Sequence, residues 1–137
     1  MQEKFSDSTP RRPEGKRAID ASLVTIDLPS YIDLIKKELS WKESDRNAIT
    51  IFKSDKLRLV LVALHPGAEM VKHISSGIIH LQVLEGNIIF LVGEQPVELN
   101  KGQIVVLHER IPHSVTAKTE AVFLLSVTLV NQEKPLA

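Results

Sequence analysis

The sequence predicts an all-β protein: an antiparallel jelly-roll β-barrel with one short N-terminal α-helix. From about residue 48, apolar residues follow a period of two in short runs rich in Val, Ile and Leu. Gly, Pro, Asn and Asp separate these runs at near-regular intervals, and no crossover helix intervenes. Because 137 residues suffice for one domain with one core, we expect residues 18–137 to form a single barrel domain.

The N-terminal part divides into a tail and a helix. Residues 1–17 are rich in Ser, Pro, Gly and charge, which predicts a flexible tail. In "PSYIDLIKKELSW", Ser30 can cap a helix, and apolar residues then recur at helical spacing. This predicts one amphipathic helix over about residues 30–40. Trp41 follows it, and a large ring at a helix end favours packing over stacking on a ligand.

About eight strands are expected after the helix: "AITIFKS", "LRLVLVAL", "IIHLQVLEG", "NIIFLVG", "QPVEL", "GQIVVLH", "HSVTA" and "AVFLLSVTLV". The last of these runs, and the segment "SLVTIDL" before the helix, would leave exposed sheet edges in a monomer. Natural proteins cover or pair such edges. The sequence therefore predicts a homodimer.

Composition excludes several classes of partner and chemistry. Lys+Arg and Asp+Glu both number 17, so there is no basic surface for nucleic acid. The absence of Cys rules out disulfides, thiolate metal sites and a Cys nucleophile. The polar N-terminus does not resemble a signal peptide, and no apolar run is long enough to span a membrane. We expect a cytoplasmic protein without membrane contact.

Glycine and histidine recur in two spaced sets. In the first set, Gly67 is followed after five residues by His73 and later by Gly86. In the second set, "GQIVVLHERIPH" runs from Gly102 to His113. Each set combines turn glycines with a histidine that lies on or beside a predicted strand.

Over roughly residues 59–127, these sets resemble the two motifs of the cupin family, G-x5-H-x-H-x3,4-E-x6-G and G-x5-P-x-G-x2-H. The resemblance implies a cupin barrel, in which four side chains hold one divalent ion. In this sequence, the positions that match those four ligands are occupied by His73, Ser75, Ile79 and His113. A serine hydroxyl and an isoleucine do not replace imidazole and carboxylate ligands. We therefore expect an incomplete metal set, His73 and His113, and no cofactor, with a divalent transition metal as the alternative.

His73 and His113 are nevertheless expected to converge in one cavity, because two separate motifs deliver them there. Paired imidazoles can bind a carboxylate or carbonyl group, or transfer protons. Ser75 would add a hydroxyl, and Ile79 and Leu81 would contact the apolar part of the ligand. The sequence thus favours a small-molecule-binding protein.

Two other functions stay open, and the sequence does not decide whether the protein is an enzyme. The first is a divalent-metal-dependent enzyme of the dioxygenase or isomerase type, which the resemblance implies. The second is a stand-alone regulator related to the sensor domains of transcription factors, although no helix-turn-helix segment follows Val127.

Three further histidines are expected to have structural or surface roles. His65 and His108 lie in turns at the barrel rim. His80 follows Ile79 directly, so it points outward if Ile79 points inward. Gln82 shares the face of His80, and the sequence leaves the orientation of both open.

Overall fold

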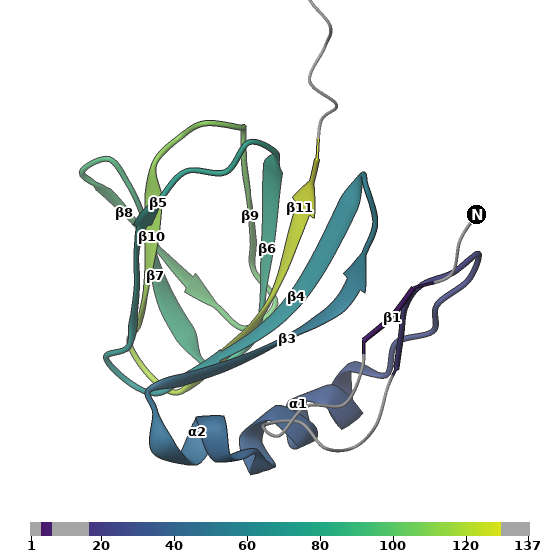
Figure 1. Cartoon of the computed structure of the whole chain (residues 1–137). Coiled ribbons are helices and arrows are strands. Elements are labelled where there is room, and N and C mark those ends of the chain that lie inside the picture. The colour runs from purple at the N-terminus through teal and green to yellow at the C-terminus, as the bar shows by residue number, and fades with distance from the viewer. Residues whose placement is uncertain (1–3, 7–16, 130–137) are drawn as a thin grey trace, which may run out of the picture.

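The structure is a computed structural model that describes residues 4–6 and 17–129, with only the backbone described at Phe5, Ser6, Lys72 and His73. The described elements are β1 (Lys4–Ser6), β2 (Arg17–Asp20), α1 (Leu28–Lys37), α2 (Leu39–Glu43), β3 (Arg46–Lys53), β4 (Leu57–Leu64), β5 (Glu69–His73), β6 (Ile78–Glu85), β7 (Asn87–Val92), β8 (Gln95–Asn100), β9 (Ile104–Leu107), β10 (His113–Ala117) and β11 (Ala121–Thr128). Strands dominate, and the two helices lie outside the strands at one end of the molecule (Figure 1).

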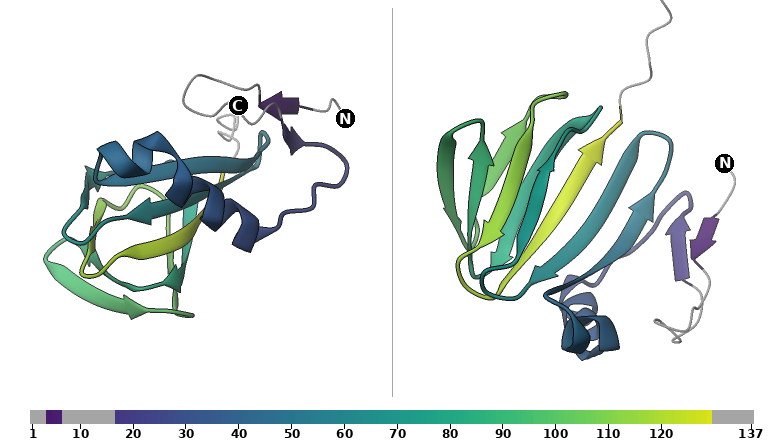
Figure 2. Two further views of the ribbon diagram at one scale, coloured as in Figure 1. Left: turned by 90° about the horizontal axis from the view of Figure 1, so that it is seen from below. Right: turned by 60° about the vertical axis from the view of Figure 1, so that its left-hand side comes forward.

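Strands β3–β11 form two antiparallel sheets that face each other (Figure 2), and β1 and β2 form a separate two-stranded sheet. A five-stranded sheet has the order β3-β4-β11-β6-β9, and a four-stranded sheet has the order β5-β10-β7-β8. The predicted mostly-β, antiparallel architecture is confirmed, and the arrangement fits a jelly roll. The expected closed barrel is not found among the described strands, because no ladder joins the outer strands of one sheet to those of the other.

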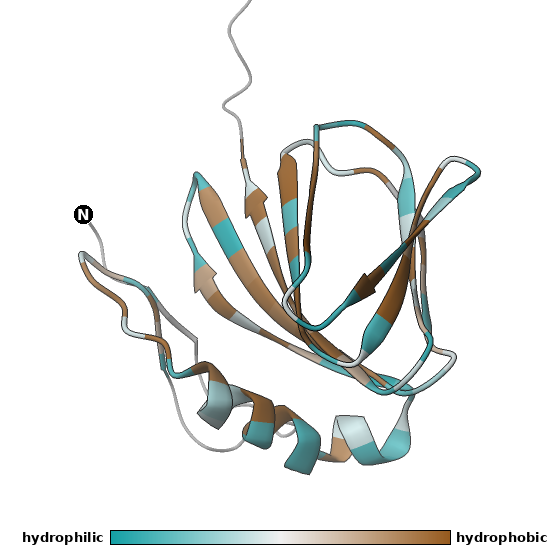
Figure 3. Cartoon of the chain, turned by 180° about the vertical axis from the view of Figure 1, so that it is seen from behind, coloured by the Kyte–Doolittle hydropathy of each residue, from teal (hydrophilic) through white to brown (hydrophobic). Residues whose placement is uncertain are grey.

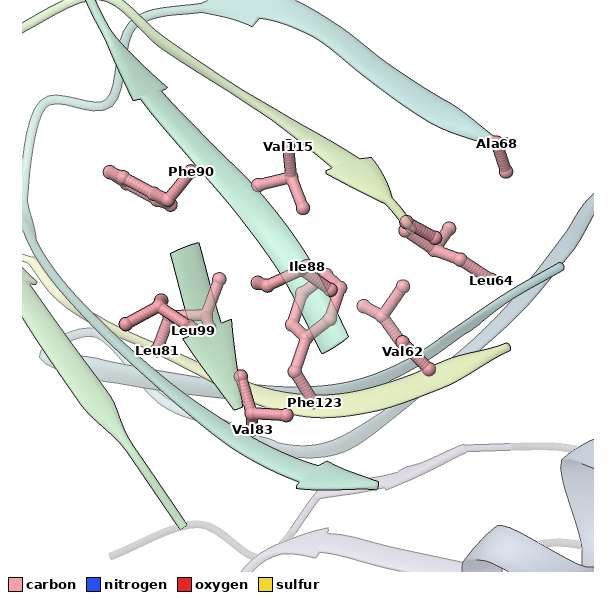
Figure 4. Close-up of a cluster of buried hydrophobic side chains, with 12 residues drawn as sticks. Val62, Leu64, Ala68, Leu81, Val83, Ile88, Phe90, Leu99, Val115 and Phe123 are labelled. Atoms are coloured by element: carbon pink, nitrogen blue, oxygen red, sulfur yellow. The ribbon is translucent and has the colours of Figure 1, made fainter. Parts of the chain in front are cut away.

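The main core lies between the two sheets. In β6, Ile79, Leu81 and Val83 alternate with half-buried residues, and all three are buried. Figure 4 shows Leu81, Val83 and Phe123 from the larger sheet directed toward Phe90 and Val115 from the smaller one. Burying one large apolar side chain contributes about 1.5–3 kcal/mol, so this two-sided packing is what holds the sheets together.

The helical segment departs from the sequence prediction in two ways. The helix α1 begins at Leu28, and Asp27 caps it by accepting a hydrogen bond from the Ser30 amide at 3.3 Å. Ser30, the expected cap, lies inside the first turn. The expected single helix over residues 30–40 is also wrong, because the backbone becomes extended at Glu38 and a second helix, α2, follows.

Asn47 explains why α1 stops there. Its buried side-chain amide donates to the Ile35 carbonyl at 2.8 Å and to Oε1 of Glu38 at 2.9 Å. The last turn of a helix leaves carbonyl groups without intrahelical partners, and Asn47 from β3 satisfies one of them. The helix end is thus set by a contact from another element.

Both helices cover the outer face of the five-stranded sheet near β3 and β4, where they build a second core. Trp41 is buried in it and stacks on His65 at a ring-centroid distance of 3.5 Å, so the expected packing role is observed. Nε2 of His65 lies 2.9 Å from the Trp41 carbonyl, which gives this histidine a structural partner. Figure 3 shows hydrophobic residues concentrated in the strands, whereas hydrophobic and hydrophilic residues alternate along the helices.

Lys36 fastens α1 to two turns of the larger sheet. Its Nζ lies 2.7 Å from Oε1 of Glu85 and 3.0 Å from Oε2 of Glu120. Burial alone would lower the pKa of Lys36, but its hydrogen bonds to the two carboxylates outweigh that effect and raise the pKa.

The segments on which the sequence based its dimer prediction are not sheet edges. The last strand, β11, lies between β4 and β6 in the middle of its sheet. The "SLVTIDL" segment is not a strand and leads into the Asp27 cap. The exposed sheet edges from which the homodimer was predicted are therefore not found in these two segments.

The predicted tail, residues 1–17, is described only in part. Its Lys4–Ser6 portion forms β1, which pairs with β2, whereas residues 1–3 and 7–16 lie outside the described residues. Nη2 of Arg17 donates to the Thr50 carbonyl at 2.7 Å, which places β2 beside β3. In the described ranges, no helix has the length and apolar character needed to cross a membrane.

Candidate functional site

His113 is the buried polar residue at the centre of the candidate site. It begins β10, and its side chain is only 3% exposed. Nδ1 lies 2.9 Å from the Ile111 carbonyl, and the ring stacks nearly parallel on Phe90 with centroids 5.5 Å apart. Because a carbonyl oxygen only accepts, Nδ1 carries a proton, and Nε2 holds the lone pair whenever the ring is neutral.

The register of β10 brings two expected site residues together at the level of the backbone. His113 lies opposite His73 of β5, and the pairing shifts before Val115, which lies opposite Met70. Three residues of β5 thus span the same distance as two of β10, which is a β-bulge. The bulge sets position 73 opposite His113; the side chain of His73 lies outside the described part of the structure.

A small cavity lies between the sheets at His113. Its lining residues come from five strands: Met70, Ile79, Leu81, Phe90, His113, Val115, Phe123 and Leu125. Ile79 and Leu81, which the sequence predicts as ligand contacts, line this cavity, and the other apolar lining residues were not predicted. The cavity measures about 10 Å³, room for about one water molecule. A larger ligand could enter only if side chains moved, and the flexible Met70 is suited to that.

A second, larger hollow is also lined by His113. Leu91, Gly93, Pro112 and Ser114 line it together with His113, and its volume is about 100 Å³. His113 therefore borders both the inner cavity and this larger hollow.

Ser75 occupies a turn rather than the cavity wall. Its hydroxyl accepts a hydrogen bond from the Gly77 amide at 3.1 Å, and its carbonyl accepts one from the Arg110 amide at 2.8 Å. Ser75 thus connects the loop before β6 to the loop before β10. Arg110 has a φ of 64°, in the left-handed region that non-glycine residues rarely adopt. Arg110 stands where the second motif has glycine, the residue that adopts this conformation most readily.

The other histidines lie away from the cavity. His80 is on the outer face of β6, because Ile79 and Leu81 point inward, and Gln82 shares that outer face. The His108 side chain is 81% exposed, with Nδ1 3.6 Å from Oε1 of Glu109. These positions agree with the structural and surface roles expected for them.

The residues with described side chains do not fit a complete divalent-metal site. No group of three His, Cys, Asp or Glu side chains gathers within that part of the chain. Ile79 offers no donor, and the Ser75 hydroxyl is held in its turn. Of the residues that line the cavity, His113 has a suitable arrangement, since a metal-binding histidine usually donates its second N–H to a carbonyl or carboxylate.

Comparisons with known proteins identify the family and the fold. A family model described as "Cupin domain" matches residues 60–128, just over half of the chain. No curated protein matches the sequence significantly.

Among solved structures, a cupin superfamily protein from Desulfitobacterium hafniense aligns with a TM-score of 0.63 and 14% identity, covering 93% of this chain and 99% of that one. A conserved protein of unknown function from Streptococcus pyogenes gives a TM-score of 0.62 and 21% identity, covering 82% and 92%. A variant of salicylate 1,2-dioxygenase from Pseudoaminobacter salicylatoxidans gives a TM-score of 0.66 and 17% identity, covering 89% of this chain but only 36% of the enzyme. At these identities the similarity concerns the fold.

Proposed function

Because the chain belongs to the cupin superfamily, we propose that it binds a small, largely apolar molecule between its two sheets, around His113. The observation that carries the proposal is a buried imidazole that borders both a small apolar cavity and a second, larger hollow. Binding sites typically combine an apolar lining with a few polar groups that orient the ligand.

The tautomer of His113 specifies the polar contact. A neutral ring whose Nδ1 donates to the Ile111 carbonyl offers a lone pair at Nε2, which accepts from a hydroxyl or a protonated acid. A protonated ring would instead donate to a carboxylate or a carbonyl oxygen. The ligand class is therefore a compact apolar body with one hydroxyl or acid group.

Replacement of His113 by alanine is expected to weaken such a ligand by about 1–3 kcal/mol, the cost of removing a buried or charge-assisted hydrogen-bond partner. The measurement is a thermal-shift titration with small phenols and organic acids, each variant being compared with its own unliganded melting temperature. His73→Ala tests the second expected histidine. His108→Ala is the matched control, because that side chain is exposed and lines neither hollow. Equal shifts in all four proteins would show that His113 does not contact the ligand.

A divalent-metal enzyme is the second candidate, and one observation favours it. The Nδ1–H contact to the Ile111 carbonyl is the arrangement that orients a ligating histidine, and position 73 lies opposite His113. Against it stands Ile79, which supplies no donor. Oxidative or isomerase chemistry is therefore proposed only as the alternative.

Metal content separates the two candidates. We expect the protein, purified without chelator or affinity tag, to contain well below one equivalent of transition metal. Chelator should leave its melting temperature unchanged, because no tightly bound ion contributes to folding. Elemental analysis and melting curves with and without chelator are the measurements. Stoichiometric metal together with a chelator-sensitive melt would favour the enzyme and reject the metal-free site.

A further inference from the structure

The inner cavity at His113 is too small for the ligand proposed above, so a part of its wall has to move. It measures about 10 Å³, whereas pockets that hold small molecules usually measure about 300–1,000 Å³. Which part of the wall moves is a question that rests on the proposed function, but the motion itself can be tested without a ligand. The order of the strands identifies the part that moves most easily.

Seven of the eight residues that line the cavity lie on strands with a neighbouring strand on both sides. These strands are β6 and β11 in the larger sheet and β7 and β10 in the smaller one. The eighth residue, Met70, lies on β5, the last strand of the smaller sheet, and among the described strands only β10 pairs with it. Moving an interior strand breaks two ladders of backbone hydrogen bonds, whereas moving β5 breaks one. Met70 therefore belongs to the part of the wall that moves at the lowest cost.

Three other strands, β3, β8 and β9, also end a sheet in the described structure, but none of them contributes a residue to the cavity. Displacing β9 would uncover Val105 and Leu107, which pack against the main core, without removing any part of the cavity wall. Only β5 combines an end position with a residue at the cavity among these strands. β9 thus serves as a control for β5.

The chain is fixed where it enters β5. The Gly67 amide donates to the Ala117 carbonyl at 2.8 Å, and the Ala117 amide donates to the Ala68 carbonyl at 2.9 Å. Nη2 of Arg46 donates to the Glu69 carbonyl at 2.8 Å, which ties the start of β5 to β3 of the other sheet. Ala68 is also buried in the main core. Residues 67–69 therefore form a firm attachment.

The chain is fixed again after β5, where it crosses to β6 in the larger sheet (Figure 1). The Ser75 carbonyl accepts a hydrogen bond from the Arg110 amide at 2.8 Å, and the Ser75 hydroxyl accepts one from the Gly77 amide at 3.1 Å. Gly77 is buried and lies so close to the backbone of Thr128 that no side chain would fit there. Residues 75–77 therefore form a second attachment.

Between the two attachments, residues 70–74 are held less firmly. The pairing of β5 with β10 shifts between Val115 and His113, and such a bulge locally disrupts the ladder. Val71 is 70% exposed and Ile74 is 61% exposed, so neighbours bury little of their apolar surface. Segments with few buried apolar contacts open at a lower free energy than the rest of a fold. We propose that residues 70–74, which we call the strap, swing away from β10 between their two attachments and admit the ligand to the inner cavity.

A single introduced thiol tests whether the strap opens. The sequence has no Cys, so Val115→Cys would carry the only thiol in the chain. Val115 lines the cavity, is 3% exposed and lies opposite Met70, so its thiol reacts with dithiobis(nitrobenzoate) only when an opening uncovers it. Val83→Cys is the matched control, because Val83 is buried in the same core but does not line the cavity. After each rate is divided by the rate of the same variant in denaturing urea, we expect Val115→Cys to react about 100-fold faster than Val83→Cys.

A second substitution locates the opening. Val71→Gly gives the strap backbone more conformational freedom, and we expect it to accelerate the labelling of Val115→Cys by roughly fivefold, without a comparable effect on Val83→Cys. Val106→Gly is its control, because it makes the same change at a 65% exposed position on β9, and it should not accelerate the labelling. Both valines are exposed, so both variants are expected to fold, which melting curves check. Val71→Ala replaces Val71→Gly if the latter does not fold.

Equal normalised rates for Val115→Cys and Val83→Cys would refute the strap, because the thiol beneath it would then be uncovered only when the whole domain unfolds. Acceleration by Val106→Gly, or none by Val71→Gly, would also refute it, because the opening would then lie outside the strap. No ligand takes part in the labelling, so its result is separate from the thermal shifts that test the proposed function. Absent thermal shifts with fast labelling would reject the proposed function, and thermal shifts with slow labelling would reject the strap alone.

Discussion

Gly86→Ala is expected to lower the free energy of unfolding by at least about 3 kcal/mol, the upper end of the usual range for one substitution. Gly86 forms the turn between β6 and β7 with a φ of 77°. A Cβ atom there would lie 2.0 Å from the Glu120 carbonyl oxygen and 2.9 Å from the Ala121 Cα. The strained backbone conformation costs about 1–2 kcal/mol, and the clash with a second backbone segment adds to it.

The two turns have little freedom to separate. Lys36 bonds to both Glu85 and Glu120, the residues on either side of the close contact. In addition, the Asn87 amide donates to Oγ1 of Thr119 at 3.0 Å. The added methyl group would therefore have to break these contacts or distort the β6–β7 turn.

Urea denaturation of Gly86→Ala and Gly102→Ala measures the effect and its cause. Gly102 has a similar φ of 89°, but no atom lies within 4 Å of the site where its Cβ would stand. In the control, Gly102→Ala, the free energy of unfolding should therefore fall only by the cost of the strained backbone, about 1–2 kcal/mol. Equal losses in the two variants would mean that the close approach of Gly86 to Glu120 is absent in solution.

The strands could be predicted because their signal is local. The alternation of Ile79, Leu81 and Val83 with polar neighbours sets which face of β6 is buried, without knowledge of any partner. The end of α1 could not be predicted, because it depends on Asn47, which reaches back to Glu38 from another element. The helix start was missed for a simpler reason: Asp27 precedes Ser30 and is an equally good cap.

The site was predictable to a smaller extent. The motif spacing identified His113, and the strand pattern indicated the inward faces of Ile79 and Leu81. Met70 and Phe90 were missed, because they come from β5 and β7, and only the order of strands in the sheets brings them beside His113. The cavity volume could not be read from the sequence at all, since it depends on how these side chains pack.

Phe90→Ala is expected to lower the free energy of unfolding by about 3–5 kcal/mol, the usual range for removing a buried aromatic side chain. Phe90 is buried between the sheets, where it packs near Val115 (Figure 4). Its ring also stacks on His113. Its loss would also enlarge the inner cavity directly beside the imidazole. Urea denaturation gives the loss of stability, and a thermal shift with benzene or phenol measures whether the new space accepts a guest.

Leu99→Ala separates the two effects, because Leu99 belongs to the same core but does not line the cavity. The free energy of unfolding of Leu99→Ala should fall by about 2–5 kcal/mol, and phenol should not stabilise this variant. Phenol should stabilise Phe90→Ala, through a contact with His113. If Phe90→Ala does not fold, the milder Phe90→Leu serves in its place with a smaller loss and a smaller gain. A loss below about 1 kcal/mol in Phe90→Ala would contradict its buried position. Equal phenol shifts in the Phe90 and Leu99 variants would place the guest away from His113.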